Sequence, residues 1–336
     1  MEAVNARDGE PSVGIVGLGY WGPNLARNFD DLPGVRLAWL CDQDESRLGH
    51  YAQRFPAARS TPRYEDLLAD EELTAVVIAT PVVTHFELAG EAMVAGKHAF
   101  VEKPLALSYI LAAQLVALAE ERGLVLMPGH LLLYHPGVDK LKEIVESGEL
   151  GSLLYVYGNR QNLGKFRRDE NALWSLGAHD LSVILHLVEE EPLEAWARGE
   201  SFLTPGVEDV VFCYLRFPSG VVAHMHLSWL DPHKMRRMTV VGDRKMAVFD
   251  DMELERKVTV YDKGPEQAAD TYGEWLTRTG DISSPKIPND EPLRLECERF
   301  LRLLRGDGDR IAPARNGLAV VRALEQLQAS LERERV

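Results

Sequence analysis

Cysteine is scarce in this chain of 336 residues, which contains only Cys41, Cys213 and Cys297 and no CxxC pair. An odd number of dispersed cysteines argues against a disulfide framework and indicates reduced thiols in the cytoplasm. Long apolar runs are also missing, and the opening stretch MEAVNARDGEPS is polar and acidic, unlike the apolar core of a signal peptide. We therefore expect a cytoplasmic protein that neither spans nor binds a membrane.

Basic residues are also few compared with acidic ones. Lysine and arginine together number 37 against 52 acidic residues, which gives a formal net charge of -15. This balance argues against nonspecific binding to nucleic acid or to anionic membranes. The expected partner is a small molecule, and any anionic part of it must be held by a local basic cluster. The apolar content of 46% and the charged content of 26% are typical of a globular protein with room for two domains.

The two parts of the chain have different patterns. Between residues 10 and 128, short apolar runs alternate with amphipathic helical segments, which predicts a doubly wound parallel sheet in a first domain, residues 1–128. From residue 129 to 336, longer alternating strands with hairpin turns predict an α+β domain with a large, mostly antiparallel open sheet. We expect the helical C-terminal end to pack back near the domain junction.

A glycine-rich stretch, GLGYWG, follows the first apolar strand and precedes a helix. This G-x-G-x-x-G pattern allows a tight turn and lets backbone amides approach a pyrophosphate at the helix N-terminus. Asp42 ends the next strand about 20 residues later, at the spacing of the dinucleotide-binding Rossmann fingerprint. Asp42 would bind the adenosine ribose and repel a 2′-phosphate, which favours NAD(H) over NADP(H). The alternatives are that Asp42 caps the helix near Glu45, or that Arg47 accepts the phosphate.

Two further apolar strands end at the same edge of the predicted sheet. One ends in IATPVVTH, where Thr80 and Pro81 would lie near the nicotinamide half of the cofactor, whereas His85 could equally be a helix residue without a role. The other ends in Glu102-Lys103-Pro104, where the proline holds Lys103 in an extended conformation. Ligands of open α/β sheets bind at this edge. The candidate cofactor-binding residues are Gly17, Leu18, Gly19, Tyr20, Trp21, Gly22, Asp42, Arg47, Thr80, Pro81, His85, Glu102 and Lys103.

The stretches GIVGLGYWG, IATPVVTH, VEKP and LGAHDLSVILH, in this order, resemble the glucose-fructose oxidoreductase/inositol dehydrogenase/MocA family. The resemblance covers nearly the whole chain. It implies a Rossmann domain, a second α/β domain with a large open sheet, and NAD(P)-dependent oxidation of a sugar or cyclitol hydroxyl. The stretches GHLLLYHPGVDKLKEIVESGELG and NRQNLGKFRRDENALWSLGAHDLS are most similar to the branch of nucleotide-sugar dehydrogenases that act at carbon 3, such as UDP-N-acetylglucosamine 3-dehydrogenases.

The resemblance also implies roles for individual residues. Lys103 falls on the family's catalytic lysine, which would stabilise the developing alkoxide of the substrate. His179 falls on the acid/base histidine, although a histidine near a helix N-terminus can also be a cap. Family members often carry an aspartate four residues earlier, where this chain has Ser175, and Asp180 should point to another face of the helix.

A basic loop, NLGKFRRDENALW, contains the three candidate phosphate-binding residues Lys165, Arg167 and Arg168. The alternative is a solvated turn paired with Asp169 and Glu170. The candidate substrate-binding residues are Lys103, Lys165, Arg167, Arg168, Ser175 and His179.

Two histidines, His224 and His226, alternate in the strand VVAHMHLSWL, but further ligands at metal-binding spacing are missing from the sequence, so we predict no metal site. This strand and VEDVVFCYLRF leave a half-apolar sheet face, which we expect a partner subunit to cover. The family resemblance implies that this assembly is a homodimer or homotetramer formed through the sheet of the second domain.

Three functions remain open at this point. The first is an NAD(H)-dependent oxidoreductase that transfers a hydride to or from a secondary alcohol of a nucleotide-linked sugar. The second is a dehydrogenase of a free sugar or free cyclitol. The third is a non-catalytic dinucleotide-binding sensor or scaffold, since a fold alone does not establish a function.

Overall fold

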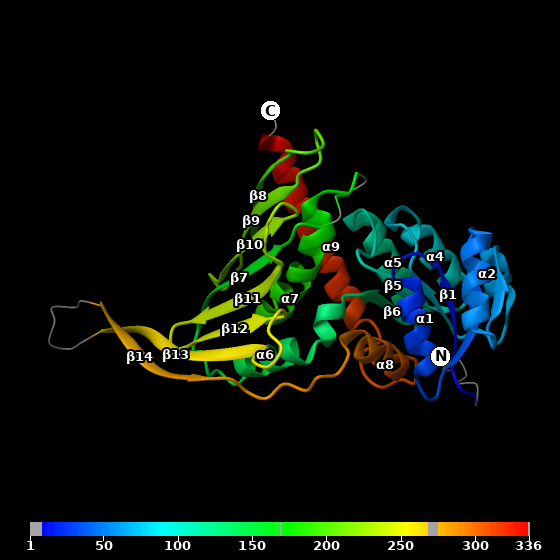
Figure 1. Ribbon diagram of the computed structural model, residues 1–336, viewed down its shortest axis with the longest axis horizontal. Coiled ribbons are helices and arrows are strands. Elements are labelled where there is room, and N and C mark those ends of the chain that lie inside the picture. Colours follow the sequence, from blue (N-terminus) through cyan, green and yellow to red (C-terminus); the bar gives the residue numbers. More distant parts are fainter. Residues whose placement is uncertain (1–8, 165, 169, 268–274, 335–336) are drawn as a thin grey trace. The chain divides into compact units, whose positions relative to one another are not determined.

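The computed structural model describes residues 9–164, 166–168, 170–267 and 275–334. Its internal contacts divide the chain into two compact units (Figure 1). Unit 1 contains residues up to Leu131 together with Glu291–Val321, and unit 2 contains Leu132–Asp290 together with the residues from Arg322 onward. Residues 291–321, which the sequence places in the second domain, therefore belong with the first unit.

Unit 1 is built on a six-stranded sheet in the order β3-β2-β1-β4-β5-β6. All neighbouring strands are parallel, which confirms the doubly wound fold. The central strands are buried along their whole length, as expected for apolar runs in a sheet covered on both faces. The strands are β1 (Ser12–Val16), β2 (Arg36–Cys41), β3 (Arg59–Thr61), β4 (Ala75–Ile78), β5 (His98–Glu102) and β6 (Leu126–Gly129).

Helices and short 3-10 turns precede or follow these strands along the chain. The helices are α1 (Gly22–Asp31), α2 (Glu45–Arg54), α3 (Tyr64–Ala69), α4 (His85–Val94), α5 (Tyr109–Arg122) and α8 (Pro292–Leu304), and the 3-10 turns are η1 (Val82–Thr84) and η2 (Leu131–Tyr134). The last helix, α9 (Ala312–Glu334), continues from unit 1 into unit 2.

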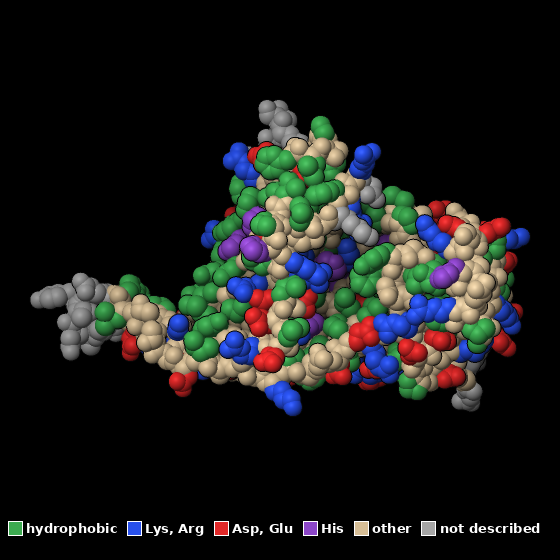
Figure 2. Space-filling view, viewed as in Figure 1, with side chains coloured by type: hydrophobic (Ala, Val, Ile, Leu, Met, Phe, Trp, Pro, Cys, Tyr) green, Lys and Arg blue, Asp and Glu red, His purple; other side chains and the backbone are tan. Residues whose placement is uncertain are grey.

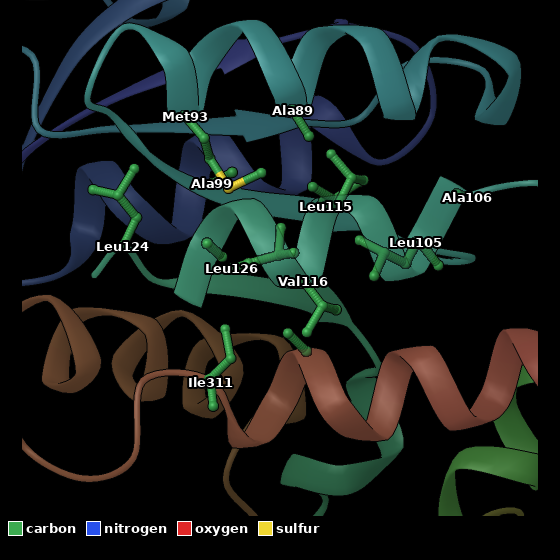
Figure 3. Close-up of a cluster of buried hydrophobic side chains, with 14 of the residues drawn as sticks. Ala89, Met93, Ala99, Leu105, Ala106, Leu115, Val116, Leu124, Leu126 and Ile311 are labelled. Atoms are coloured by element: carbon green, nitrogen blue, oxygen red, sulfur yellow. The ribbon is translucent and has the colours of Figure 1, made fainter. Parts of the chain in front are cut away.

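A buried apolar cluster holds α4 and α5 against β5 and β6, and Figure 3 shows its side chains pointing toward one another. It includes Met93 from α4, Leu115 from α5 and Ile311 from the segment before α9. The local sequence fits α5: Ser108 accepts a hydrogen bond from the N–H of Leu111 at its start, and Gly123 ends it in the left-handed conformation.

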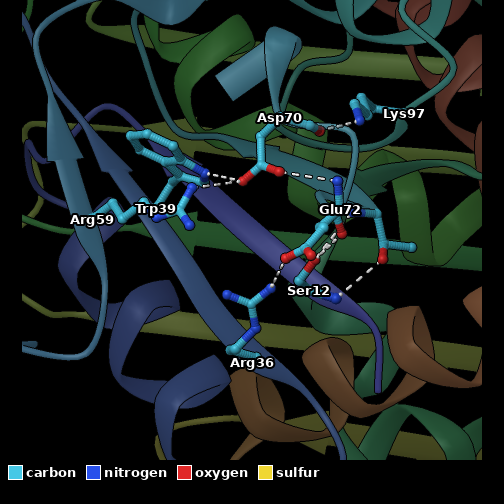
Figure 4. A network of polar contacts seen from close by, with 8 residues as sticks. Ser12, Arg36, Trp39, Arg59, Asp70, Glu72 and Lys97 are labelled. Atoms are coloured by element: carbon cyan, nitrogen blue, oxygen red, sulfur yellow. Dashed lines mark hydrogen bonds and ion pairs between the residues drawn. The ribbon is translucent and has the colours of Figure 1, made fainter. Parts of the chain in front are cut away.

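A polar network lies at the amino-terminal ends of the strands of unit 1 (Figure 4). Asp70 accepts hydrogen bonds from the indole N–H of Trp39 at 2.7 Å and from the backbone N–H of Glu72 at 2.9 Å. Lys97 Nζ donates to the carbonyl oxygen of Asp70 at 2.6 Å, and the hydroxyl of Ser12 donates to that of Glu72 at 2.6 Å. These contacts join the starts of β1, β4 and β5.

Unit 2 is built on an eight-stranded sheet in the order β14-β13-β12-β11-β7-β10-β9-β8. Only β7 and β10 pair in parallel, so the mostly antiparallel sheet predicted from the sequence is confirmed. The strands are β7 (Leu153–Gln161), β8 (Glu194–Glu200), β9 (Val210–Arg216), β10 (Val222–Ser228), β11 (Met235–Gly242), β12 (Met246–Asp250), β13 (Val258–Gln267) and β14 (Trp275–Ser283).

Two helices, α6 (Pro136–Glu146) and α7 (Ala178–Val188), pack on β7, β12 and β13 of this sheet. A π-helical turn, Leu173–Gly177, leads directly into α7. The sequence pattern predicted the helix but not this turn, which has one residue more per hydrogen-bonded ring than an α-helix. Among the described residues, no helix combines the length and the apolar content that a membrane span requires.

Candidate functional site

The glycine loop follows β1 and opens α1, and its three glycines have different reasons to lack a side chain. Gly17 has φ of 91°, and a Cβ there would lie 2.7 Å from the carbonyl oxygen of Ala79. A Cβ on Gly22 would lie 1.8 Å from the carbonyl oxygen of Gly17, whereas a Cβ on Gly19 would meet nothing within 4 Å. Packing within the protein therefore explains Gly17 and Gly22 but not Gly19. The open backbone at Gly19 fits a cofactor diphosphate that approaches the N-terminus of α1, where no side chain caps the helix.

Asp42 lies at the end of β2 and holds the glycine loop. One carboxylate oxygen accepts the N–H of Leu18 at 2.6 Å, and the other accepts the N–H of Asp44 at 2.8 Å. The N-cap of α2 is Asp44, which accepts the N–H groups of Ser46 and Arg47. The alternative role of Asp42 as a helix cap is therefore wrong, because that role belongs to Asp44.

A hollow of about 580 Å³ lies beside this loop and the first turns of α2. Arg47 lies at its wall with the guanidinium 3.2 Å from the carboxylate of Asp44, so a local acid pairs its charge. Sequence reasoning missed Ser46, His50 and Tyr51, although residues four apart on one helix share a face. The hollow is lined by Leu18, Gly19, Tyr20, Ser46, Arg47, His50 and Tyr51.

His85 connects the loops that follow β4 and β5. Its ring is 1% exposed, with Nδ1 2.8 Å from the carbonyl oxygen of Pro104 and Nε2 3.0 Å from that of Thr80. Burial lowers the pKa of His85, although the two carbonyl contacts oppose this change. The hydroxyl groups of Thr80 and Thr84 lie 2.7 Å apart. His85 thus contacts both strand-end loops, one at Thr80 and the other at Pro104, which directly follows Lys103.

Glu102 and Lys103 stand at the end of β5. The carboxylate of Glu102 accepts the backbone N–H of Lys103 at 3.3 Å, and the peptide bond between Lys103 and Pro104 is cis. Burial raises the pKa of Glu102 to about 7, while the positive charge of Lys103 opposes the rise. Because β2, β1, β4 and β5 are neighbours in the sheet, Asp42, the glycine loop, Thr80 and Lys103 lie along one edge in that order.

In unit 2, the candidate residues Ser175 and His179 lie in the π-helical turn and the first turn of α7. Ser175 is 7% exposed, and His179 is partly exposed. Asp180 is buried and faces β7, where its Oδ1 accepts two hydrogen bonds from Arg160 at 2.7 Å and 2.9 Å. This pair fixes the start of α7, and the expectation that Asp180 and His179 point to different faces stays a prediction.

The basic loop is partly described. Lys165, together with Asp169, lies outside the described residues. Arg167 is exposed and forms an ion pair with Glu170 at 2.5 Å, and Arg168 is exposed. The pairing of Arg167 with Glu170 agrees with the alternative of a turn whose charges pair with one another.

His224 and His226 lie among aromatic side chains on β10. The ring of His224 stacks on Tyr157 at 4.9 Å, and that of His226 stacks on Phe212 at 4.4 Å. Figure 2 shows hydrophobic and histidine side chains side by side where Figure 1 labels β9, β10 and β7. Within the described ranges, no group of three or more metal-ligating side chains is present. Assembly through this face stays a prediction.

The comparisons with known proteins cover both units. Residues 12–130 match the profile of an oxidoreductase family with an NAD-binding Rossmann fold, and residues 138–248 match the GFO/IDH/MocA C-terminal domain. A UDP-N-acetylglucosamine 3-dehydrogenase of Acidithiobacillus ferrooxidans is 31% identical over 253 residues, which cover 75% of this chain and 77% of that protein. A solved structure of that enzyme, GnnA, has a TM-score of 0.83 at 26% identity and covers 96% of this chain and 98% of its own.

Two other similar proteins broaden the comparison. The structure of GenD2 from gentamicin A biosynthesis, in complex with NAD, has a TM-score of 0.81 at 26% identity and covers 99% of this chain and 97% of its own. A scyllo-inositol 2-dehydrogenase (NAD(+)) of Bacillus subtilis is 25% identical over 230 residues, or 65% of this chain and 67% of that protein. On the profiles that match both of its parts, the chain belongs to the GFO/IDH/MocA family of oxidoreductases with an NAD-binding Rossmann domain.

Proposed function

We propose that this protein is an NAD(H)-dependent dehydrogenase that oxidises or reduces the secondary alcohol at carbon 3 of a nucleotide-linked sugar. The observation that carries the reaction class is the arrangement of the open glycine loop, Asp42 and Lys103 along one edge of the parallel sheet. In open α/β sheets this edge binds the cofactor. The similarity to a UDP-N-acetylglucosamine 3-dehydrogenase supports the substrate and the reacting carbon.

The preference for NAD(H) rests on the charges around the hollow. Asp42 places a carboxylate next to the glycine loop, where the adenosine ribose would bind and a 2′-phosphate would be repelled. Arg47 is the cation that could reverse this preference, but its guanidinium is paired with Asp44. The NAD complex of GenD2 also supports the proposal.

Lys103 and His179 are the two functional groups of this proposal. The nicotinamide, when bound, accepts or donates the hydride. Lys103 provides a positive charge that stabilises the oxygen of the substrate as negative charge develops on it. His179 takes or returns the hydroxyl proton, which suits an imidazole near neutral pH. Because Ser175 offers no carboxylate to orient His179, replacement by aspartate should change the pH profile of turnover if His179 is the base.

The substrate phosphates would be held by the basic loop. Charge-assisted contacts with phosphate contribute roughly 1.5–3 kcal/mol each. If Arg167 and Arg168 both make such contacts, then the Arg167→Ala/Arg168→Ala double variant should raise the KM for the nucleotide sugar by about 100-fold or more. Cofactor affinity should stay within about twofold, because the cofactor edge belongs to unit 1. The decisive experiment is this KM measurement, followed by NADH absorbance, alongside a screen of nucleotide sugars and of inositol.

One observation favours a second candidate, a free-cyclitol or free-sugar dehydrogenase. Arg167 is already paired with Glu170 in the protein, as expected for a turn that has no phosphate to bind. The similarity to scyllo-inositol 2-dehydrogenase points in the same direction. Turnover of inositol at ordinary concentrations, unaffected by the double variant, would establish this candidate and refute the nucleotide-sugar assignment.

A further inference from the structure

Two carboxyl groups and a histidine lie near Lys103 in unit 1: Glu296 and His130 are buried, and Glu102 is half-buried. The pairing of β5 with β6 sets Glu102 opposite Gly129, so that His130 follows directly at the same sheet edge. A Cβ on Gly129 would already lie 3.4 Å from the carboxyl carbon of Glu102. His130, which follows β6, therefore lies close to the end of β5, where Lys103 stands.

Helix α8 brings Glu296 to the same place. Phe300 of α8 packs edge-on against Phe100 of β5 with ring centroids 5.6 Å apart. Glu296 lies one helical turn before Phe300, and Glu102 lies two strand residues after Phe100. These steps measure about 6 Å along a helix and about 6.6 Å along a strand. Steps of this similar length are compatible with neighbouring carboxyl groups, and the negative charge of Glu102 does act on Glu296.

The burial of this cluster is deep, and part of it lacks hydrogen bonds. Glu296 is 1% exposed and His130 is 2% exposed. Oε1 of Glu296 and both ring nitrogens of His130 have no hydrogen-bond partner among the described residues. Polar groups buried in this way lower stability, and they occur in native proteins mainly where a role compensates for the loss.

The charges that these groups can carry follow from their surroundings. Burial raises the pKa of Glu296 well above its ordinary value, and the negative charge of Glu102 raises it further. Burial, assisted by the positive charge of Lys103, lowers the pKa of His130 to about 3. Cys297, next on α8, is a neutral thiol because burial raises its pKa well above the ordinary value. Glu291, at the start of α8, is paired with Arg27.

Near neutral pH, Glu102 is thus the member of the cluster that can take a negative charge, whereas Glu296 and His130 stay neutral. We propose that Glu102 is the counter-ion that holds Lys103 as an ammonium ion, and that Glu296 and His130 are neutral positioning residues that leave this one negative charge in the cluster. The inference rests on the proposed function only for its consequence in turnover. There, an ammonium group held by a neighbouring counter-ion would stabilise a developing alkoxide.

Competitive acetylation tests the proposal without any substrate. The folded full-length protein is treated with trace acetic anhydride over a range of pH, and the modification of Lys103 is read by mass spectrometry of its peptide. The exposed Lys234 serves as the internal reference. In the Glu102→Gln variant the pH of half-reaction of Lys103 should fall by about one unit or more, since an opposite charge at close range has an effect of this size.

The Glu296→Gln variant should leave the half-reaction of Lys103 within about 0.3 pH units of the wild type, because one neutral group replaces another. Glu298→Gln is the matched control, since Glu298 lies on the same helix in an exposed ion pair with Arg294. An unchanged half-reaction in Glu102→Gln would overturn the proposal. So would a shift in Glu296→Gln as large as that expected for Glu102→Gln, because Glu296 would then be charged.

Infrared difference spectra provide a second test if Glu102→Gln does not fold. The wild type minus Glu296→Gln should show the carbonyl stretch of a protonated carboxyl group near neutral pH, and its absence would refute a neutral Glu296. The pH profile of kcat/KM separates this inference from the proposed function. Its alkaline limb should move in Glu102→Gln by the same amount as the acetylation curve. A moved acetylation curve with an unmoved pH profile would retain the counter-ion and reject the role of Lys103 in turnover.

Discussion

Acidic side chains at the two ends of the six-stranded sheet of unit 1 differ in their hydrogen bonding. At the amino-terminal end, Asp70 is paired with Trp39, Glu72 and Arg59 (Figure 4). At the carboxyl end, Glu296 is more deeply buried and one of its oxygens has no partner among the described residues. The acidic group at the amino-terminal end of the sheet thus has hydrogen-bond partners, whereas the one at the carboxyl end lacks a partner for one oxygen. This difference is expected if only the carboxyl end belongs to a functional site.

The two ends also respond to pH with opposite signs. The pKa of Asp70 is lowered from 3.8, because burial, which would raise it, is outweighed by the hydrogen bonds from Trp39 and Glu72 and by the charges of Arg59 and Lys97. Its stabilising contribution is present above this value and is lost as the pH falls through the lowered pKa. The pKa values of Glu102 and Glu296 are raised from 4.5, so their contribution is present below this value and is lost as the pH rises through the raised ones.

The largest difference between the two ends should come from the lysines that flank β5. Lys103→Met removes the charge that stabilises the developing alkoxide and should lower kcat by about 10²–10³-fold, with NADH affinity within about threefold. Lys97→Met, the matched variant at the other end, loses the contact with the carbonyl oxygen of Asp70 and should cost about 1 kcal/mol of stability with kcat within about twofold. Steady-state kinetics, NADH titration and urea unfolding measure these effects. Equal losses of kcat in both variants would show that the two ends of the sheet do not differ in their role in turnover.

Two aspartates allow the same comparison for the cofactor. The wild type should bind NAD(H) at least tenfold more tightly than NADP(H), because Asp42 opposes a 2′-phosphate. Asp42→Asn should reduce this ratio toward one, whereas Asp70→Asn should leave it unchanged. Fluorescence titration with both reduced cofactors measures the ratio. A wild-type ratio near one would show that Arg47 leaves Asp44 and accepts the phosphate.

The opposite pH responses give a prediction on stability. Between about pH 4.5 and 7, the free energy of unfolding of the wild type should decrease as the pH rises, and Glu296→Gln should remove part of this decrease. The removed part should be on the order of 1 kcal/mol or more, since one unit of pKa corresponds to about 1.4 kcal/mol. Asp70→Asn should flatten only the acid limb below about pH 4. Urea midpoints over the pH range test both variants, and a decrease that survives in Glu296→Gln would show that Glu296 does not titrate there.

The smallest effect should come from Arg59, whose side chain is 63% exposed at 3.4 Å from Asp70. Exposed ion pairs of this kind contribute about 0.2–1 kcal/mol, so Arg59→Ala should cost less than 1 kcal/mol, with less effect at high salt. A loss above 2 kcal/mol would show that Asp70 depends on this arginine more than on Trp39.

The edge of the parallel sheet was predictable because local signals mark it. The sequence directly shows the apolar strands, the glycines after β1 and the proline after Lys103, which mark where each strand ends. Parallel strands then bring these carboxyl ends to one edge of the sheet. The large antiparallel sheet of unit 2 was predictable from alternation, but β8, β13 and β14 were not identified. Nor was the π-helical turn before α7, because its sequence also suits an α-helix.

The buried cluster behind Lys103 was not predictable, because it joins residues far apart in the chain. Glu296 stands in the apolar stripe of α8, one turn from Phe300, and an acid in such a stripe is the available signal. The pattern alone does not say which strand the stripe covers. The wall of the hollow on α2 was missed for a different reason: Ser46, His50 and Tyr51 follow a helical spacing that also suits a solvent-facing surface.

Transfer of deuterium tests the central claim most directly. The wild-type protein is mixed with NAD+ and nucleotide sugars that carry deuterium at carbon 3, and the nicotinamide product is collected for mass spectrometry. The account predicts that NADH absorbance rises with at least one nucleotide sugar and that the NADH formed contains one deuterium. NADH formed without deuterium would refute reaction at carbon 3. Absence of NADH with every nucleotide sugar, in a protein that binds NAD+, would contradict the assignment as a nucleotide-sugar dehydrogenase.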